Sequence, residues 1–215
     1  MKRNKVAKKP VRLLFFDTET TGLPSRDKKV RKDPLSWPRL IEIGWVLTSD
    51  DGRILEKKSN LIIPESFVVP EAATLIHGIT TEEAQKNGIP LSDALSEFCQ
   101  TIQTVDVIIA HNLSYDIRII ITELIRKQSR SELPAISGIC TMKSSAAFCA
   151  IPGKFGKGFK WPSLKFLHMS LFNTHPETAH RALDDAQTCA RCYHELKRRE
   201  VEMKAEDITH IFFRK

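Results

Sequence analysis

The chain has 215 residues, of which 41% are hydrophobic and 27% charged, as in an ordinary folded protein with one sizeable core. The formal net charge of +7 at pH 7 favours an acidic partner, most simply nucleic acid. A membrane partner is not expected, because Arg118 and Glu123 interrupt the best apolar candidate, residues 117–125, well short of a bilayer span.

Strand patterns dominate the beginning of the chain. The apolar run 11–16 predicts a buried strand, and segments 40–47 and 53–63 predict two more, joined into a hairpin by a turn at 50–52. The basic, polar segment 24–33 predicts a surface loop. Because three strands precede any long helix, we expect the sheet to have an antiparallel portion.

Helices and strands alternate in the remainder of the chain. Further strands are predicted at 105–110 and 135–141, and Thr80-x-x-Glu83 is a capping box that marks the start of a helix. Helices are predicted at 70–75, 82–86, 91–103, 117–125, 164–171 and from near Leu183 onward. The expected organisation is a basic N-terminal tail at 1–10, one domain at 11–204 and a C-terminal tail at 205–215.

The cysteines and the start of the chain indicate the cellular compartment in which the protein is expected. Five cysteines, an odd number, lie mostly in apolar segments, so we expect reduced, buried thiols rather than disulfides. The pattern Cys189-x-x-Cys192 lacks the second pair that a zinc site needs. The basic start is not followed by a signal-peptide core, because the apolar run 11–16 is too short. We therefore expect a cytoplasmic protein.

Two acids, Asp17 and Glu19, follow the first apolar run at alternate positions. Residues two apart in extended backbone point the same way, so both carboxylates face one point beyond the end of the strand, where open α/β sheets hold ligands. Two adjacent like charges need neutralisation, which a hard divalent cation with oxygen ligands supplies. An ordinary polar exit from a strand is the alternative, and this stretch alone leaves both open.

Three further polar residues lie near the starts of helices. Asp116 lies between the predicted strand 105–110 and the helix after it, and Asp185 opens the last helix one residue before its first core position, Ala186. His180 lies on the loop before that helix. Taken singly, Asp116 has the simpler explanation of a favourable charge at a helix N-terminus, and His180 that of a surface or capping residue.

Together these residues form three motifs in a fixed order. They are Phe16-Asp17-Thr18-Glu19-Thr20-Thr21-Gly22-Leu23, His111-Asn112 through Tyr115-Asp116, and His180-x-Ala182-x-x-Asp185. Their order and spacing resemble the DEDDh exonucleases, a family defined by four acids and a histidine that includes the proofreading epsilon subunit of bacterial DNA polymerase III. Segment 76–80, Ile-His-Gly-Ile-Thr, is similar to one typical of the epsilon-like branch. The resemblance spans residues 13–196 and implies an α/β, RNase H-like fold, a mixed five-stranded sheet flanked by helices.

The resemblance also implies a reaction: hydrolysis of phosphodiesters from the 3′ end of mainly single-stranded DNA, releasing nucleoside monophosphates. Asp17, Glu19 and Asp185 would bind two Mg²⁺ ions directly, and Asp116 would complete the shell of the second, with Mn²⁺ as a substitute. His180 would be the general base that takes the proton from the attacking water, because an imidazole titrates near neutral pH.

A frayed 3′ end bound as a single strand implies contacts around these motifs. The residues implied in substrate binding are Thr18, Thr20, Gly22, Leu23, His77 and Asn112. Segment 154–161 interleaves lysines with aromatic residues, as a surface that stacks single-stranded bases would. The alternative is a solvated loop whose aromatic side chains pack into the core, and the sequence leaves both open.

Other functions share this set of motifs. Related enzymes trim RNA with the same four acids and histidine. No residue in the sequence unambiguously indicates recognition of a 2′-hydroxyl, so a 3′–5′ exoribonuclease is an alternative. A subunit that docks on a DNA polymerase, or on another replication or repair protein, is a second alternative, with residues 205–215 as a docking peptide. A free-standing enzyme is favoured over it. The intact acid set argues against a catalytically inactive nucleic-acid binder.

Overall fold

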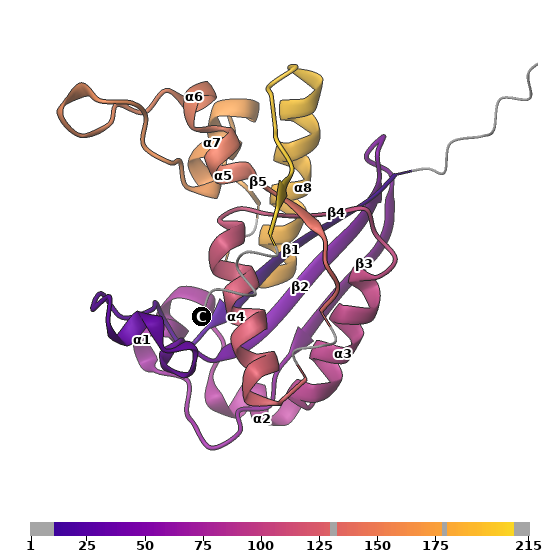
Figure 1. The fold of residues 1–215 in the computed structure, drawn as a ribbon, viewed down its shortest axis with the longest axis vertical. Helices are drawn as coiled ribbons and strands as arrows, with labels where there is room; N and C mark the ends of the chain where they lie inside the picture. The colour runs from indigo at the N-terminus through magenta and orange to yellow at the C-terminus, as the bar shows by residue number, and fades with distance from the viewer. Residues whose placement is uncertain (1–10, 130–132, 178–179, 209–215) are drawn as a thin grey trace, which may run out of the picture.

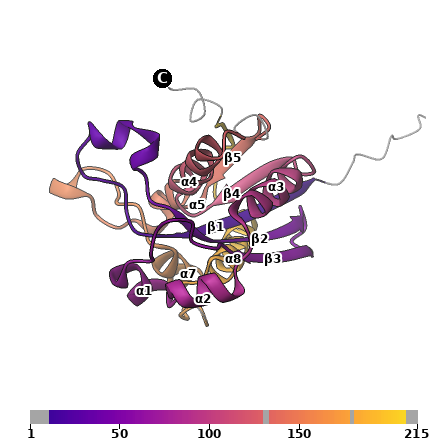
Figure 2. The same ribbon diagram turned by 90° about the horizontal axis from the view of Figure 1, so that it is seen from below.

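A six-stranded mixed sheet with helices on both faces forms the centre of the computed structural model, which describes residues 11–129, 133–177 and 180–208 (Figures 1 and 2). In spatial order the strands are β3 (Ile54–Leu61), β2 (Leu40–Ser49), β1 (Arg12–Thr20), β4 (Val107–Ala110), β5 (Ser137–Cys140) and β6 (Glu206–Asp207). β4 runs parallel to β1 and to β5, whereas the other neighbouring pairs are antiparallel.

The helices follow the predicted segments, with short additional turns, except that the helix expected at 117–125 begins at Leu113 and so includes Asp116. The α-helices are α1 (Glu71–His77), α2 (Thr81–Asn87), α3 (Leu91–Ile102), α4 (Leu113–Arg126), α5 (Thr141–Ser144), α6 (Ala146–Cys149), α7 (Leu164–Phe172) and α8 (Ala182–Arg198). The 3₁₀ turns are η1 (Val30–Lys32), η2 (Pro34–Ser36) and η4 (Lys154–Gly156). The predicted N-cap is formed, because the Thr80 hydroxyl accepts a hydrogen bond from the Glu83 amide at 3.1 Å. Among the described residues, no helix is long and apolar enough to cross a membrane.

β1 is covered on both of its faces. Leu13 and Phe15 pack in one hydrophobic cluster with Ala186 of α8, whereas Leu14 and Phe16 pack in a larger cluster with residues of α3 and α4. Figure 2 shows α3 and α4 on one side of the sheet and α7 and α8 on the other. Successive strand residues point to opposite faces, so a continuous apolar run is the pattern of a strand buried on both sides.

The α/β class and the mixed sheet are confirmed, but two details of the prediction are wrong. The sheet has six strands rather than five, because residues 206–207, which were expected in a C-terminal tail, pair with β5. β1 continues through the acid pair to Thr20 rather than ending at Phe16, because β2 pairs with it along that length. The acids therefore lie within the strand and not beyond it.

β1 is also longer than its parallel neighbour. β4 pairs with residues 13–15 of β1 and ends at Ala110, whereas β2 follows β1 as far as Thr20. The last part of β1 thus has no strand on its β4 side. Side chains from both faces of the sheet can approach β1 there.

The cysteines and the C-terminal segment fit into this core. All five cysteines are free thiols, as predicted, and three of them are buried. Ile208 is buried in the larger hydrophobic cluster, so it contributes to the domain itself rather than to an exposed docking peptide. The rest of the proposed docking peptide, 209–215, lies outside the described residues.

Candidate functional site

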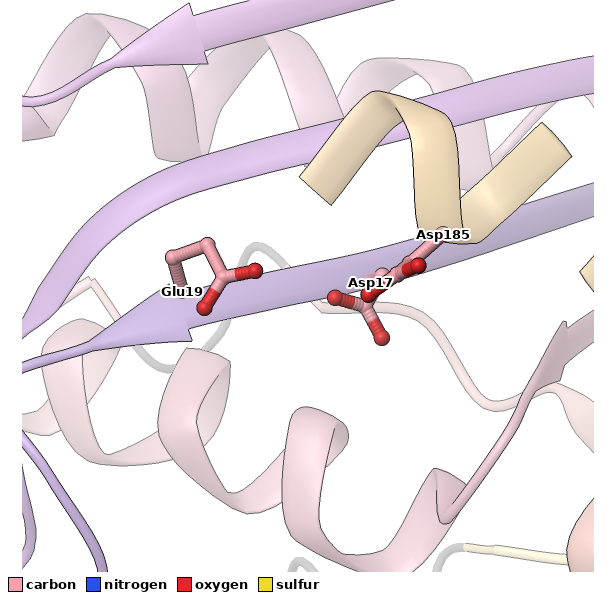
Figure 3. Close-up of side chains that lie close together, drawn as sticks. All are labelled: Asp17, Glu19 and Asp185. Carbon is pink, nitrogen blue, oxygen red and sulfur yellow. The ribbon is translucent and has the colours of Figure 1, made fainter. Parts of the chain in front are cut away.

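Three carboxylates from two elements meet on one face of the sheet. Oxygen atoms of Asp17, Glu19 and Asp185 all lie within 4.8 Å of one another. Figure 3 shows Asp17 and Glu19 on β1 beside the turn of α8 that carries Asp185. The strand repeat points the first two acids to the same face, and Asp185 lies in the first turn of the helix that packs on that face.

A glycine of β2 lets α8 come close enough to bring Asp185 to the strand. Gly44 pairs with Asp17 across β1 and β2. A Cβ atom at this position would lie 2.2 Å from the backbone nitrogen of Leu183 and 2.5 Å from the carbonyl carbon of Ala182. Both are backbone atoms of the first turn of α8, so any larger residue at position 44 displaces the turn that contains Asp185.

The fourth acid, Asp116, reaches the site from the other face of the sheet. It lies in the first turn of α4 and is buried. The Thr18 hydroxyl donates a hydrogen bond of 2.8 Å to its Oδ1 atom, and Thr18 points to the α4 face because it alternates with Asp17 and Glu19. Asp116 is not among the three carboxylates within 4.8 Å of one another, yet its charge contributes to the raised pKa of Asp17.

Burial raises the pKa of all four acids. Burial is the largest cause in each case; it raises the pKa of Glu19 to about 8 and that of Asp116 to about 7. The pKa values of Asp17 and Asp185 are also raised. Repulsion from the neighbouring carboxylates adds to the rise for Asp17 and Glu19. A bound divalent cation would remove this penalty, and carboxylate oxygens are the ligands that Mg²⁺ and Mn²⁺ prefer, so the donor set fits such ions.

A further buried acid, Glu42, fixes the start of α8. It pairs with Glu19 across β1 and β2. Arg181 donates to it from two nitrogens, with Nη2 at 2.7 Å from Oε1 and Nε at 3.1 Å from Oε2, and the Ala182 amide donates to Oε2 at 2.9 Å. Sequence reasoning missed Glu42 and Arg181. The available signal was a single acid inside the otherwise apolar stretch 40–47.

His180 lies directly before this anchored arginine. Its side chain is exposed and its backbone is left-handed, with a φ of 65°. The imidazole is not among the clustered metal-ligating groups, but it is near enough to lower the pKa of Asp185. The histidine thus borders the carboxylates on the solvent side.

The residues predicted to contact substrate fall into two groups. Thr18 and Thr20 are buried and hold the site together: Thr18 bonds Asp116, and the Thr20 hydroxyl lies 2.7 Å from the Tyr115 hydroxyl and 2.8 Å from the Gly22 carbonyl oxygen. Gly22 has a φ of 143°, which favours glycine, and Leu23 is 86% exposed. Tyr115 was not predicted as a site residue, although it lies within the second motif.

His77 and Asn112 are positioned by their own turns. His77 is buried, and its Nδ1 atom accepts a hydrogen bond from the Ile79 amide at 3.1 Å. Burial lowers its pKa. Asn112 caps α4 in a left-handed conformation, with a φ of 95° and no hydrogen bond from its side chain to the helix. Both remain predictions as substrate contacts.

Comparisons with known proteins identify the family and the fold. The family model RNase_T, described as exonuclease, matches residues 14–193. The fold is similar to that of the nuclease domain of 3′hExo, a DEDDh family member bound to rAMP, with a TM-score of 0.70 at 15% identity over 93% of this chain and 98% of that one. The predicted RNase H-like fold is thereby confirmed.

Two other solved structures share the fold. A full-length 3′-exonuclease has a TM-score of 0.66 at 15% identity, covering 95% of this chain and 66% of that one. Escherichia coli exonuclease I in complex with a dA16 oligonucleotide has a TM-score of 0.61 at 17% identity, covering 94% of this chain and 42% of that one. The chain therefore spans less than half the length of exonuclease I. No curated protein matches the sequence.

Proposed function

The chain belongs to the exonuclease family whose model matches residues 14–193, and from this premise we propose that it removes nucleoside monophosphates from the 3′ ends of DNA with the help of divalent cations. It is a nuclease, a hydrolase of phosphodiesters. The observation that carries the finer proposal is the set of three carboxylates within 4.8 Å of one another, with a fourth on the opposite face of the same strand. Two structures with a similar fold, a 3′-exonuclease and the nuclease domain of 3′hExo bound to rAMP, support the 3′ polarity.

Asp17, Glu19 and Asp185 would hold the cations, and Asp116 would complete their shell. Bound divalent ions supply charge neutralisation at the phosphoryl group and lower the pKa of water. The protein contributes the orientation of the ligands: the hydroxyl of Thr18 holds Asp116, and the position of α8 holds Asp185. Two Mg²⁺ ions are the proposed complement, with Mn²⁺ as a substitute.

His180 is the proposed general base. Its exposed position beside Asp185 allows the imidazole to accept the proton of the attacking water once a substrate covers the site. Arg181, held by Glu42, fixes the backbone directly after the histidine. The anchored arginine limits how far the exposed side chain can move from the carboxylates.

A projecting aromatic segment supports a single-stranded substrate. Residues 151–160 fold back on themselves, because Pro152 and Phe159 form a β-bridge and the Lys160 amide donates to the Ile151 carbonyl oxygen at 2.9 Å. Phe155, Phe159 and Trp161 are 96%, 52% and 61% exposed, so the alternative in which they pack into the core is wrong. Exposed aromatic rings among lysines are suited to stacking unpaired bases. In Figure 1 this segment projects well away from the sheet.

The test is a degradation assay with labelled substrates. Single-stranded DNA, duplex DNA with frayed or matched 3′ ends, and RNA, each labelled at the 5′ or the 3′ end, are incubated with Mg²⁺, Mn²⁺ or chelator. We expect mononucleotide release from 3′ ends of single-stranded DNA, dependent on the metal. Faster trimming of RNA would assign the alternative exoribonuclease activity.

Two neighbouring acids of α8 provide a matched pair of variants. Asp185→Asn removes a proposed ligand and should abolish degradation. Asp184→Asn makes the same change one residue earlier, outside the carboxylate cluster, and should leave degradation intact. Equal activity of both variants would contradict the proposed site.

A further inference from the structure

A basic cavity lies beside the first turn of α4, the turn that carries Asp116. It has a volume of about 640 Å³, and its lining includes Lys28, Arg31, Lys32, Trp37, Tyr115 and Arg118. This volume lies in the range of roughly 300–1,000 Å³ typical of ligand sites. Two aromatic rings form part of its wall, with the Trp37 and Tyr115 ring centroids 6.2 Å apart. The cavity is therefore large enough for a nucleotide and carries the charge of a phosphate-binding site.

The wall that carries these cations is anchored to the domain. Arg126 of α4 donates to the carbonyl oxygens of Trp37 at 2.7 Å and Leu35 at 2.9 Å, and its other guanidinium nitrogen bonds the buried carboxylate of Glu123. The Trp37 indole donates to the carbonyl oxygen of Arg31 at 3.0 Å. Three of these hydrogen bonds tie segment 24–39 to α4 and to itself, so this part of the cavity wall is a built feature of the structure.

The cavity and the carboxylate site share Tyr115. Its ring lines the cavity, its hydroxyl donates to the Gly22 carbonyl oxygen at 2.9 Å, and the next residue in the chain is Asp116. Burial raises the pKa of Tyr115 to about 12, with contributions from the charges of Asp116 and Glu19. Tyr115 and the neighbouring Asp116 thus place the cavity next to the α4 side of the carboxylate site.

Charge favours a polyanion at this position. Segment 24–39 carries six lysines and arginines and two aspartates, so its net charge is +4 of the +7 of the whole chain. Its two aspartates, Asp27 and Asp33, accept hydrogen bonds from backbone amides of the same segment. No salt bridge is formed to Lys28, Arg31 or Lys32 by any described residue.

We propose that this cavity binds the phosphates of the nucleotides immediately upstream of the one being removed, and so selects a strand over a single nucleotide. The proposal rests on the proposed nuclease function, because it assumes a 3′ end at the carboxylates. Lys28, Arg31 and Lys32 contact the phosphates, and the walls of Trp37 and Tyr115 provide apolar surface for a sugar or base.

Two substrates separate the cavity from the catalytic centre. The first is (dT)20, which extends into the cavity, and the second is the p-nitrophenyl ester of thymidine 5′-monophosphate, which has no upstream nucleotide. The test variant is Arg31→Gln with Lys32→Gln. The control is Arg26→Gln with Lys29→Gln, which removes the same charge from the same segment at positions that do not line the cavity.

We expect the test variant to raise KM for (dT)20 at least tenfold, with KM for the ester unchanged. Loss of two phosphate contacts should also make the plot of log K for (dT)20 binding against log salt concentration less steep, by about 1.4 in slope. The control variant should keep wild-type values for both substrates. A KM for (dT)20 within twofold of wild type, or an equal effect in the control variant, would overturn the proposal.

Binding of (dT)20 is also measured by fluorescence anisotropy in chelator, so that the test of the cavity does not depend on turnover. A wild-type protein that hydrolyses neither substrate contradicts the nuclease function, whereas weaker (dT)20 binding by the test variant alone still supports the cavity. Competition by poly-glutamate as strong as that by (dT)20 would assign the cavity to an acidic protein and overturn the proposal.

Discussion

The clustered carboxylates predict that the metal-free protein loses stability as pH rises above neutrality. Burial raises the pKa of Glu19 from 4.5 to about 8 in the folded protein. Between these values the folded protein holds a proton that the unfolded chain has released, so the free energy of unfolding decreases with increasing pH. The contribution is fully present below pH 4.5 and is lost as pH rises through 8. Bound Mg²⁺ should remove this dependence above neutrality, because it keeps the folded cluster ionised.

The size of the effect follows from the pKa of Glu19. From pH 7 to 8.5, a group with a pKa of about 8 in the folded state and 4.5 in the unfolded state removes about 1.2 kcal/mol of stability. Buried histidines act in the opposite sense: burial lowers the pKa of His111 to about 4, which makes stability rise with pH, but mainly below pH 6.5. Comparing wild type with Glu19→Gln above pH 7 therefore excludes most of the histidine contribution to the pH dependence of stability.

The measurement is urea unfolding in chelator at pH 7 and 8.5, for wild type and Glu19→Gln. We expect wild type to lose about 1 kcal/mol more than the variant over this interval, and the difference to vanish in millimolar Mg²⁺. Equal losses in the two proteins, or a wild-type stability that increases with pH relative to the variant, would refute the assignment of a proton to the buried cluster.

Three further outcomes test individual parts of the site. Gly44→Ala should cost about 1–3 kcal/mol of stability and weaken Mg²⁺ binding by calorimetry, because its Cβ meets the backbone of Leu183; unchanged Mg²⁺ affinity would contradict this. His180→Ala should lower turnover by roughly 10²-fold or more while Mg²⁺ and DNA binding persist, and binding lost in step with turnover would count against a general base. Phe155→Ala with Trp161→Ala should weaken single-stranded DNA binding by about 1–3 kcal/mol per stacked base. It should leave the melting temperature unchanged, since both rings are exposed; binding equal to wild type argues against stacking.

Much of the fold was predictable because its signals are local. The apolar run that became β1 contains buried residues on both faces, and a hydroxyl and an amide three residues apart formed the expected cap at Thr80. The end of β1 was not predictable in this way. It depends on pairing with β2, a segment more than twenty residues away, and nothing in Asp17 or Glu19 distinguishes a paired residue from a turn residue. The sixth strand has the same cause, because two acidic residues carry no strand pattern of their own.

The site was predictable as a set of residues and less so as an arrangement. The motifs indicated Asp17, Glu19, Asp116 and Asp185 by resemblance, and the structure brings three of them together, with Asp116 bonded to Thr18 on the other face. Their roles as ligands stay predictions. The supporting contacts were missed, because they join residues distant in sequence. The pair Arg181 and Glu42 is separated by 139 positions, and the approach of α8 depends on a glycine whose neighbours appear only in the folded chain.

Glu42 explains why the other acids remain available for a cation. It faces Glu19 across two antiparallel strands, and its charge contributes to the raised pKa of both Asp17 and Glu19. The protein supplies Glu42 with a two-nitrogen contact from Arg181. No described residue forms a salt bridge to the three clustered acids or to Asp116. If Arg181 turned to Glu19 instead, it would neutralise the cluster and compete with a metal. By holding the arginine on β2, Glu42 keeps the start of α8 in place. The negative charge of the cluster is then not neutralised by Arg181, and a bound cation can neutralise it. Glu42→Gln should therefore weaken Mg²⁺ binding even though it removes a negative charge from the neighbourhood, and tighter Mg²⁺ binding by calorimetry would show that simple repulsion dominates.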